Sequence, residues 1–592
     1  MRLGTDTGGT FTDLVDDEGR TAKVPSTPHD PGAAVRSGIE ALGGGRPALL
    51  THGTTVATNA LLERRGAEVT LVTTAGFADV IEIARQDRPS LYDPFADRPE
   101  PLVDRARRIG IGGRLDASGS EIEPLVLDGL DSIPAGWTVA VCLLHADLNA
   151  SHERAVASAL RARGLDVTCS HEVSPTFREY ERTITTVVNA YLRPITRAYM
   201  ARLRDAADDV HVLTSAGGLL PLDVAAELPV TLTLSGPAGG VRAAIAAALA
   251  NDEPDVVTFD MGGTSTDVCL VLGGEPEPAA ERTVAGFPLR VPALDVLTIG
   301  AGGGSLAWID EGGALRVGPR SAGAVPGPAC YGRGGDRPTV TDADLVAGRI
   351  PADAELPGIG RLDIGAARRA LQRAGVTAEG VLRVVDASTE QAIRAVTVAR
   401  GVDPRRCALV AFGGAGPLHA AALADALGMK RVIVPARAGV LSAAGVLASP
   451  LQRDLVRSWP TPTAHEGLAA ATDELAREAL ALVGGDATVE VSLDCRYAGQ
   501  SHELTVASID DFHHAHERRN GYARPDAPIE VIALRATARR APAVTLDELP
   551  EPTRERAVGP AVIAESDCTV WVPPGWRARQ GAAGALLLER DR

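Results

Sequence analysis

The chain has 592 residues, of which 45% are hydrophobic and 23% charged, and its formal net charge is −17. Because a single core rarely grows beyond roughly 250 to 300 residues, this length predicts several domains, and we expect three. The acidic balance argues against nucleic acid or an anionic membrane as the main partner, since phosphate binding needs a basic surface, so small molecules or proteins are expected instead.

The N-terminal region alternates strand-like and helix-like runs. Residues 67–76 and 137–147 have the apolar, β-branched character of buried strands, whereas residues 31–43 and 152–164 have the spacing of amphipathic helices. This alternation is typical of a layered α/β domain. We therefore predict an α/β lobe over residues 1–178.

A long amphipathic stretch from 179 to 207, interrupted by Pro194, predicts a helix that connects two lobes. The α/β rhythm then resumes, and we predict a second lobe over residues 179–450. A stretch rich in glycine and proline, 318–338, interrupts this lobe and is too long for a tight turn, which favours a functional loop. Residues 451–592 predict a smaller, β-rich C-terminal domain.

One short pattern occurs in both predicted lobes, as GTDTGGTFTDLV at 4–15 and as TFDMGGTSTDVC at 258–269. Each copy predicts a strand, a tight glycine turn and a second strand, because both glycines accept positive φ. The positions that coincide are Asp6 with Asp260, Gly8 with Gly262, Gly9 with Gly263, Thr10 with Thr264, Thr12 with Thr266, and Asp13 with Asp267.

These two hairpins contain the groups that a magnesium–nucleotide complex requires. A turn without side chains lets backbone N–H groups approach an anion, and threonine hydroxyls add donors. Asp6 and Asp260 would repel a phosphate directly but can hold a hydrated Mg²⁺ that neutralises it. We therefore expect the hairpins to face each other across a polyphosphate. Two ordinary hairpins are the alternative.

A third glycine-rich stretch, residues 409–428, predicts a buried strand, a glycine turn and a helix that begins near Pro417. Glycines at such a turn allow a flat base or a ribose to lie against the backbone. By itself this is a common strand-to-helix turn. Following two phosphate hairpins, it predicts an adenosine site at Gly413, Gly414 and Gly416.

The seven cysteines include no Cys-x-x-Cys pair, which argues against a zinc cluster and a disulfide framework. The first residues lack the apolar core of a signal peptide, and no run approaches the 18 apolar residues of a membrane span. These features lead us to expect a cytoplasmic protein with reduced thiols.

Beyond the hairpins, longer motifs resemble one family throughout the chain. The three glycine elements resemble those of the superfamily that contains actin and the sugar kinases. More specifically, several longer motifs resemble those of the hydantoinase A/5-oxoprolinase family. They are HGTTVATNALLERRGA, REYERTITTVVNAYL, LSGPAGGV, GAGGGSLAW, SAGAVPGPACYGRGGDRPTVTDADLV, AFGGAGPLHA, YAGQSHELTV and GPAVIAESDCTVWVPPGW. The resemblance implies an α/β fold with two actin-like lobes around a nucleotide cleft.

The same resemblance implies an enzyme that uses ATP and Mg²⁺ to open a cyclic amide such as a hydantoin or 5-oxoproline. A related carboxylase subunit acting on a ketone, and a nucleotide-gated activator of a partner protein, are the alternatives. Family members often work with a second polypeptide of the hydantoinase B type, and no such partner is fused here. We therefore expect one subunit of a larger, oligomeric enzyme.

The expected site residues follow from these motifs. Asp13 and Asp267 are candidates for orienting water or metal, with a purely structural role as the alternative. His52 is the candidate for handling a proton, and a buried histidine near a helix N-terminus is its alternative. Gly302 and Gly303 would offer backbone donors to phosphate or substrate unless they form a close-packed turn. The remaining phosphate contacts are assigned to Gly8, Gly9, Thr10, Thr12, Gly262, Gly263, Thr264 and Ser265.

Overall fold

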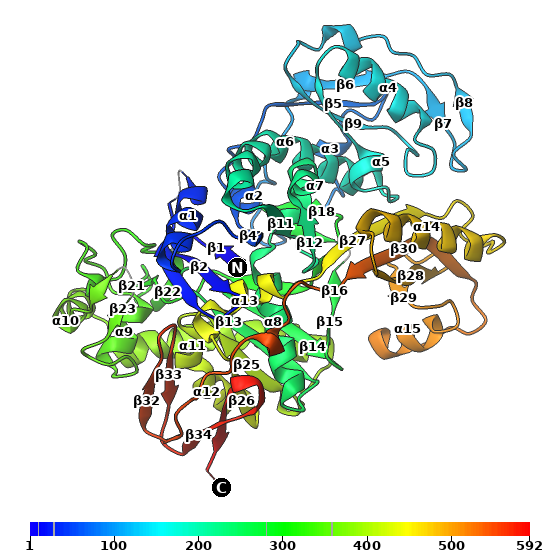
Figure 1. Ribbon diagram of the computed structural model, residues 1–592. Helices are drawn as coiled ribbons and strands as arrows, with labels where there is room; N and C mark the ends of the chain where they lie inside the picture. The colour runs from blue at the N-terminus through cyan, green and yellow to red at the C-terminus, as the bar shows by residue number, and fades with distance from the viewer. Residues whose placement is uncertain (10, 28–29, 280, 357–358, 592) are drawn as a thin grey trace.

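The computed structural model describes residues 1–591 except 10, 28–29, 280 and 357–358. Two large mixed sheets and one small parallel sheet carry most of the described strands, and helices pack on their faces (Figure 1). Thr10, one of the expected phosphate ligands, lies outside the described residues. Among the helices of the described part, none combines the length and apolar character needed to cross a membrane.

The first large sheet has the strand order β29-β28-β30-β27-β12-β11-β4-β1-β2-β3. The first predicted hairpin lies near one end of this sheet, where β1 pairs antiparallel with β2 and parallel with β4. β11 continues the parallel pairing beyond β4. The bounds are β1 Arg2–Thr7, β2 Phe11–Asp16, β3 Thr21–Pro25, β4 Leu49–Thr54, β11 Asp209–Leu213 and β12 Leu219–Pro221.

The second large sheet repeats this arrangement. Its hairpin strand β13 pairs antiparallel with β14 and parallel with β25, and β26 continues the parallel pairing. β13 and β25 are almost entirely buried, as expected of central strands covered on both faces. The bounds are β13 Val256–Met261, β14 Thr266–Leu272, β15 Glu275–Pro276, β20 Val296–Ile299, β25 Ala408–Phe412 and β26 Arg431–Val434.

Two helices pack closely between the large sheets. A Cβ on Gly445 of α13 would lie 1.9 Å from the carbonyl oxygen of Gly239 in α8, so the two helices meet backbone to backbone. On its other side α13 reaches β1, where a Cβ on Gly4 would lie 2.3 Å from the carbonyl oxygen of Ala443. These glycines therefore allow α8 (Gly236–Ala250) and α13 (Leu441–Leu447) to join the two sheets without intervening side chains.

The small sheet, β10-β9-β5-β6, is parallel throughout and has a hydrophobic core of its own. It lies at one end of the molecule, and α6 runs between it and the first large sheet (Figure 1). The predicted linking helix is therefore present, ending at 203. The bounds are β5 Val69–Thr74, β6 Arg108–Ile111, β9 Thr138–Cys142, β10 Asp166–Cys169, α4 Ser151–Ala162, α5 Ser170–Val173 and α6 Glu179–Leu203.

Residues 451–592, expected to form one β-rich domain, are instead divided between the two large sheets. β27 (Leu451–Ser458), β28 (Thr488–Tyr497), β29 (Leu504–Val506) and β30 (Ile529–Arg540) extend the first sheet. β31 (Ala557–Val558), β34 (Trp576–Gln580) and β35 (Leu586–Arg590) extend the second. β27 therefore pairs with β12 and β35 with β26, so that the edges of the two sheets lie at β29 and β31.

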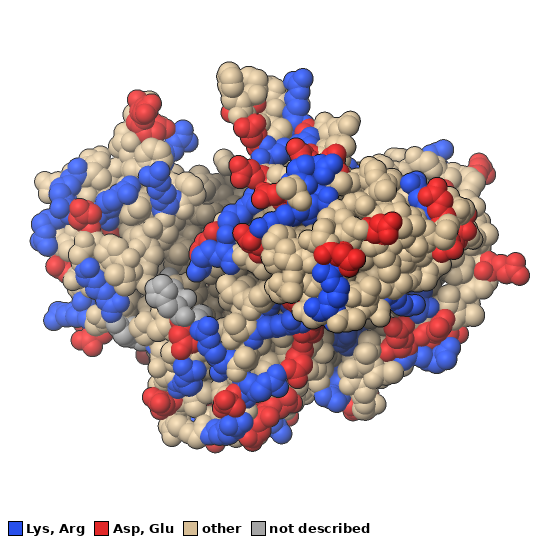
Figure 2. All heavy atoms as spheres, turned by 90° about the horizontal axis from the view of Figure 1, so that it is seen from above, with Lys and Arg blue, Asp and Glu red and all other residues tan. Residues whose placement is uncertain are grey.

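The remaining described helices complete the layers. Their bounds are α1 Pro31–Ala41, α2 Val56–Leu62, α3 Val80–Ile83, α7 Leu222–Glu227, α9 Val340–Val346, α10 Ile364–Arg373, α11 Ala378–Val396, α12 Gly416–Leu427, α14 Leu468–Val483 and α15 Phe512–Asn520. α9 and α10 belong to a part of the molecule that a deep hollow separates from the rest in the view from above (Figure 2).

Candidate functional site

Four aspartates from the two hairpins form one cluster, which we call the aspartate cluster: Asp6, Asp13, Asp260 and Asp267. Asp6 stands directly opposite Asp13 in the register of β1 and β2, and Asp260 stands directly opposite Asp267 in β13 and β14. Burial and the charge of Asp267, followed by those of Asp6 and Asp13, raise the pKa of Asp260 well above its ordinary value. The two hairpins are therefore close enough for their charges to interact.

The other three carboxyl groups also have raised pKa values, and burial is the largest cause in each. Burial, reinforced by the charge of Asp13, raises the pKa of Asp6 to about 7. Burial raises the pKa of Asp267 to about 6 and also raises that of Asp13. Carboxylates held this close repel one another unless a cation lies among them.

The contacts of the cluster fit a divalent cation. Asp6 Oδ1 is buried without a hydrogen-bond partner, although its carboxylate packs against β4, where a Cβ on Gly53 would lie 2.8 Å from that oxygen. Asp13 is paired with Lys23 Nζ at 2.6 Å, and Asp267 accepts a hydrogen bond from Thr298 Oγ1 at 2.5 Å. Oxygen ligands with unused lone pairs are the donor set that Mg²⁺ prefers.

Sequence reasoning missed Lys23 and Asp567. Lys23 lies opposite Asp13 in the register of β2 and β3, so the alternation of that hairpin would have indicated it. Asp567 comes from the C-terminal segment, accepts a hydrogen bond from the backbone N–H of Gly439 at 2.8 Å, and contributes its charge to the raised pKa of Asp13. Its sequence neighbourhood gives no comparable signal, because the contact spans more than a hundred residues.

The two hairpin turns close in the same way. The backbone N–H of Gly8 donates to the carbonyl of Phe11 at 3.0 Å, and that of Gly262 donates to the carbonyl of Ser265 at 3.1 Å. Contrary to expectation, Gly8, Gly9 and Gly262 do not use the left-handed region. A Cβ on Gly9 would meet nothing within 4 Å. Glycine is therefore not needed here for its backbone conformation, and its missing side chain leaves the space beside the turn open.

The threonines of the motif divide into two groups. Thr12 is fully buried, and its hydroxyl lies 3.1 Å from that of Ser26, so it faces the protein interior and not a ligand as expected. Its counterpart Thr266 is also buried and donates to the carbonyl of Ala301 at 2.5 Å. Thr264, at the tip of the second turn, is exposed. Of these three threonines, only Thr264 remains available to a ligand.

The loop at 300–304 supports the second turn from below. The N–H groups of Gly303 and Gly304 donate to the carbonyls of Gly262 and Gly263 at 2.9 and 2.7 Å, and that of Gly302 donates to Ser305 Oγ at 2.8 Å. These donors are occupied, so the geometry favours the alternative of a close-packed turn for Gly302 and Gly303.

The third glycine stretch lies beside the aspartate cluster. Gly413 has φ +79°, and a Cβ at this position would lie 2.2 Å from Asp260 Oδ1 and 2.6 Å from the carbonyl oxygen of Met261. Gly414 is exposed, and a Cβ there would meet nothing within 4 Å. Gly416 begins α12, whose N-terminus therefore points toward the same region. The structure thus brings together the three glycine elements that the sequence predicts.

His52 lies elsewhere than expected. Its side chain is fully buried, Nδ1 is 2.6 Å from Thr5 Oγ1, and Nε2 is 2.5 Å from the hydroxyl of Tyr199 in α6. Burial lowers the pKa of His52 to about 3, so the ring is neutral at physiological pH. Both nitrogens are occupied, and the structure therefore favours the buried-histidine alternative over a proton-handling residue.

A buried charged group supports the loops around the cluster. His419 of α12 lies between Asp386 of α11, at 2.6 Å from Nδ1, and Asp344 of α9, at 3.3 Å from Nε2. Burial lowers the pKa of His419, but the two carboxylates outweigh it and raise the pKa to about 10. α9 also carries Thr341, which donates to the carbonyl of Gly303 at 2.8 Å. This arrangement joins the adenosine-type loop to the loop beneath the second turn.

We expect the protein to lose stability as the pH rises from about 7 to 10. Because the pKa of His419 is raised above its unfolded value of about 6.5, its contribution is full below that value and is lost as the pH rises through about 10. Urea unfolding at pH 7 and pH 10 measures the loss. His419→Gln should lower the free energy of unfolding at pH 7 by about 1–3 kcal/mol and flatten this pH dependence. An unchanged slope in the variant would contradict the assignment.

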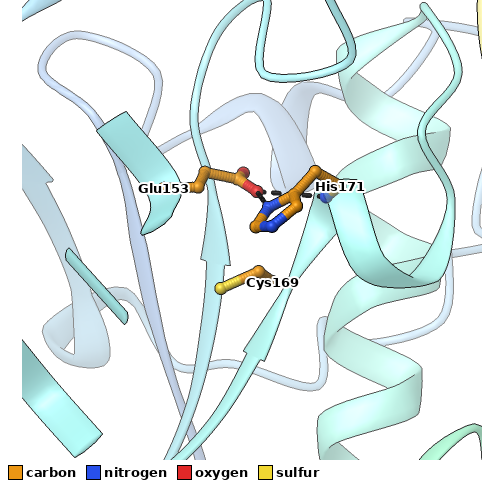
Figure 3. A group of neighbouring side chains, drawn as sticks. All are labelled: Glu153, Cys169 and His171. Atoms are coloured by element: carbon orange, nitrogen blue, oxygen red, sulfur yellow. Dashed lines mark hydrogen bonds and ion pairs between the residues drawn. The ribbon is translucent and has the colours of Figure 1, made fainter. Parts of the chain in front are cut away.

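A second group of chemically reactive side chains lies in the small-sheet region, where Glu153, Cys169 and His171 are neighbours (Figure 3). Glu153 accepts hydrogen bonds from the backbone of Leu143 and His171, from Ser170 Oγ and from His171 Nδ1, at 2.7 to 3.0 Å. Burial raises the pKa of Cys169. With four donors on its carboxylate and a protonated thiol beside it, this group ties α4 to β9 and α5.

Comparisons with known proteins agree with the motifs of the sequence. The hydantoinase/oxoprolinase family model matches residues 182–454, and the model of the hydantoinase/oxoprolinase N-terminal region matches residues 2–164. The caprolactamase subunit alpha of Pseudomonas jessenii is 35% identical over 97% of each chain. The crystal structure of the ATP-dependent caprolactamase from that organism superposes with a TM-score of 0.86, at 33% identity and with both chains fully covered. The acetophenone carboxylase gamma subunit of Aromatoleum aromaticum is 33% identical over 73% of this chain and 66% of that subunit.

Proposed function

The chain belongs to the hydantoinase/oxoprolinase family. From this premise we propose that it hydrolyses ATP to open the ring of a cyclic amide, such as a hydantoin or 5-oxoproline. The observation that carries the proposal is the aspartate cluster. Two hairpins with matching registers, one in each large sheet, place four carboxylates together, and one carboxylate oxygen has no hydrogen-bond partner. Such a cluster suits a cation that accompanies a polyphosphate.

The arrangement of the two large sheets supports an actin-like architecture. In each sheet a hairpin is followed by two parallel strands, and α8 and α13 join the sheets at the centre. We assign one actin-like lobe to each sheet and the nucleotide to the region where the hairpins face each other. Asp6 and Asp260 would hold Mg²⁺, which supplies charge neutralisation for phosphoryl transfer.

The backbone of the three glycine elements would bind the nucleotide. Gly8 and Gly9 in the first turn, and the segment from Gly262 to Ser265 in the second, surround the position proposed for the phosphates. Gly413, Gly414 and Gly416 would lie against the adenosine, where the open space at Gly414 leaves room for a base or ribose. Gly302 and Gly303 would act indirectly by holding the second turn.

ATP has a clear chemical purpose in this reaction. An amide carbonyl is stabilised by resonance, and a five-membered lactam recloses readily. Transfer of the γ-phosphoryl group to the amide oxygen would release ADP and make the ring carbon electrophilic, so that water can add to it. The ring C–N bond would then break, with the nitrogen taking a proton and leaving as an amine, and a second water would hydrolyse the resulting acyl phosphate to a carboxylate and inorganic phosphate. The protein mainly contributes positioning and charge stabilisation to such a transfer. Asp267, with its pKa raised to about 6, is suited to orient a water molecule, whereas Asp13 is engaged by Lys23.

A second subunit is part of the proposal. The caprolactamase relative is named as a subunit alpha and the acetophenone carboxylase relative as a gamma subunit. Those names support an assembly in which this chain binds ATP and a partner of the hydantoinase B type completes the site for the cyclic amide. The relation to a carboxylase subunit also makes ATP-driven carboxylation of a ketone the second candidate.

An ATPase assay distinguishes these functions. The protein, purified alone and with its co-purifying partner, is assayed with hydantoin, 5-oxoproline and caprolactam, and separately with a ketone plus bicarbonate. We expect hydrolysis that requires Mg²⁺ and is stimulated by at least one cyclic amide. Stimulation by ketone and bicarbonate alone would establish the second candidate, and stimulation by the partner without any small molecule would indicate an activator. No Mg²⁺-dependent ATP binding would refute all three.

A further inference from the structure

The aspartate cluster belongs to two rows of side chains that cross the large sheets from strand to strand. In the first sheet Asp6 of β1 stands opposite Asp13 of β2, and Asp13 stands opposite Lys23 of β3. Residues that stand directly opposite each other in antiparallel strands have neighbouring side chains on the same face of the sheet. Lys23 is therefore the third member of a row that begins with a proposed metal ligand.

The second large sheet contains a matching row with a different third member. Asp260 of β13 stands opposite Asp267 of β14, and Asp267 stands opposite Thr298 of β20. In each row the third residue bonds to the middle aspartate. Lys23 Nζ lies 2.6 Å from Asp13 Oδ1, and Thr298 Oγ1 donates to Asp267 Oδ1 at 2.5 Å. The two rows therefore match in geometry but differ in charge, because lysine is a cation and threonine is neutral.

Lys23 is fixed in its place by several contacts. Besides its bond to Asp13, Nζ donates to the carbonyl oxygen of Gly439 at 3.2 Å and lies 5.3 Å from the centre of the Phe11 ring. Only 20% of the lysine side chain and 18% of the Asp13 side chain are exposed. Water and salt screen a charge pair in such a position less than they screen a pair on the open surface.

The charge of Lys23 acts on both halves of the cluster. Burial raises the pKa values of Asp6, Asp13 and Asp260, and the lysine opposes that rise in all three. Within the described part of the chain, Lys23 is the only cation whose charge contributes appreciably to these three pKa values. The lysine therefore offsets part of the negative charge that the cluster concentrates.

We propose that Lys23 is a positioning residue that acts as the fixed counter-charge of this site, neutralising Asp13 so that the polyphosphate meets one negative charge fewer. The inference rests on the function proposed above, in which a divalent cation and a nucleotide bind at the cluster. A positive charge repels the cation and attracts the nucleotide, so removing it should change the two affinities in opposite directions. The loss of a merely structural lysine would weaken both.

Isothermal titration calorimetry of the full chain tests this sign difference with two probes. One is Mn²⁺ alone, which prefers the same oxygen ligands as Mg²⁺, and the other is ADP at saturating Mg²⁺. Lys23→Met should bind Mn²⁺ about threefold to thirtyfold more tightly and ADP about tenfold more weakly than the wild type. Lys23→Arg keeps the charge and should restore both affinities to within about threefold of the wild type.

Two further variants control for charge and for folding. Arg20→Met removes a positive charge just before β3, where Arg20 pairs with Asp16 and Glu18 outside the cluster, and should leave both affinities unchanged. Circular dichroism establishes that each variant is folded. If Lys23→Met does not fold, Asp13→Asn carries the same test in reverse, because it leaves the lysine charge uncompensated and should weaken Mn²⁺ binding while strengthening ADP binding.

The outcomes separate this inference from the proposed function. Any result in folded Lys23→Met other than tighter Mn²⁺ and weaker ADP binding overturns the inference, while wild-type protein that binds both probes leaves the proposed function standing. If the wild type binds neither Mn²⁺ nor ADP, the proposed function itself is wrong, and the inference falls with it.

Discussion

Asp260→Asn is expected to lower the rate of ATP hydrolysis by about a thousandfold and, at the same time, to stabilise the metal-free protein. The rate falls because the proposed cation loses one carboxylate ligand next to the developing charge. The fold becomes more stable because burial and three neighbouring carboxylates raise the pKa of Asp260, which means that they disfavour a negative charge at this position, and Asn carries none. We expect a gain of about 1–3 kcal/mol in the free energy of unfolding.

Steady-state kinetics and urea unfolding with and without Mg²⁺ measure the two effects together. Asp255→Asn is the matched control, since Asp255 immediately precedes β13 and its Oδ1 accepts a hydrogen bond from the backbone of Gly273, away from the cluster. That variant should change neither quantity appreciably. If Asp260→Asn lost activity and stability in parallel, the aspartate would serve the fold and not the reaction, and the proposed metal site would be wrong.

Gly413→Ala is expected to reduce ATP hydrolysis by about a hundredfold and to destabilise the protein by about 2–4 kcal/mol. The new methyl group would lie 2.2 Å from Asp260 Oδ1 and would require the left-handed backbone, which costs a non-glycine residue about 1–2 kcal/mol. Displacing Asp260 by about an ångström is enough to lose about two orders of magnitude in rate. The measurements are kcat, the KM for ATP and the thermal unfolding midpoint.

Gly414→Ala provides the matched control one residue further along. Gly414 does not use the left-handed region, and its Cβ would meet nothing within 4 Å, so the variant should fold as well as the wild type. If the open space belongs to the nucleotide, this variant should nevertheless raise the KM for ATP. Equal stability losses in both variants would show that the loop tolerates neither methyl group and that Gly413 has no special relation to Asp260.

The family and the two hairpins could be recognised from the sequence because they depend on local information. Asp6 and Asp13 lie symmetrically about a glycine turn, so pairing the strands places them opposite each other whatever the rest of the chain does. The same holds for Asp260 and Asp267. Long motifs in a fixed order indicated the family, which the matching family models confirm over residues 2–164 and 182–454.

Which side chains face the site could not be read from the chain in the same way. His52 and Thr12 belong to the expected motifs, but the packing of α6 and β3 around the first sheet encloses both. The N–H groups of Gly302 and Gly303 are occupied because the loop that carries them folds against the second turn. For His52 and Gly303 a segment distant in the sequence occupies the polar group, whereas Thr12 and Gly302 are engaged by the nearby Ser26 and Ser305.

The sequence alone therefore determined the strands, the turns and the carboxylates that stand opposite one another, since strand pairing across a short turn follows from spacing. Only the tertiary structure brought the two hairpins into one cluster, added Asp567 to its surroundings, and divided residues 451–592 between both sheets. The physical reason is that electrostatic contact and burial depend on distances between segments separated by hundreds of residues, which local patterns do not encode.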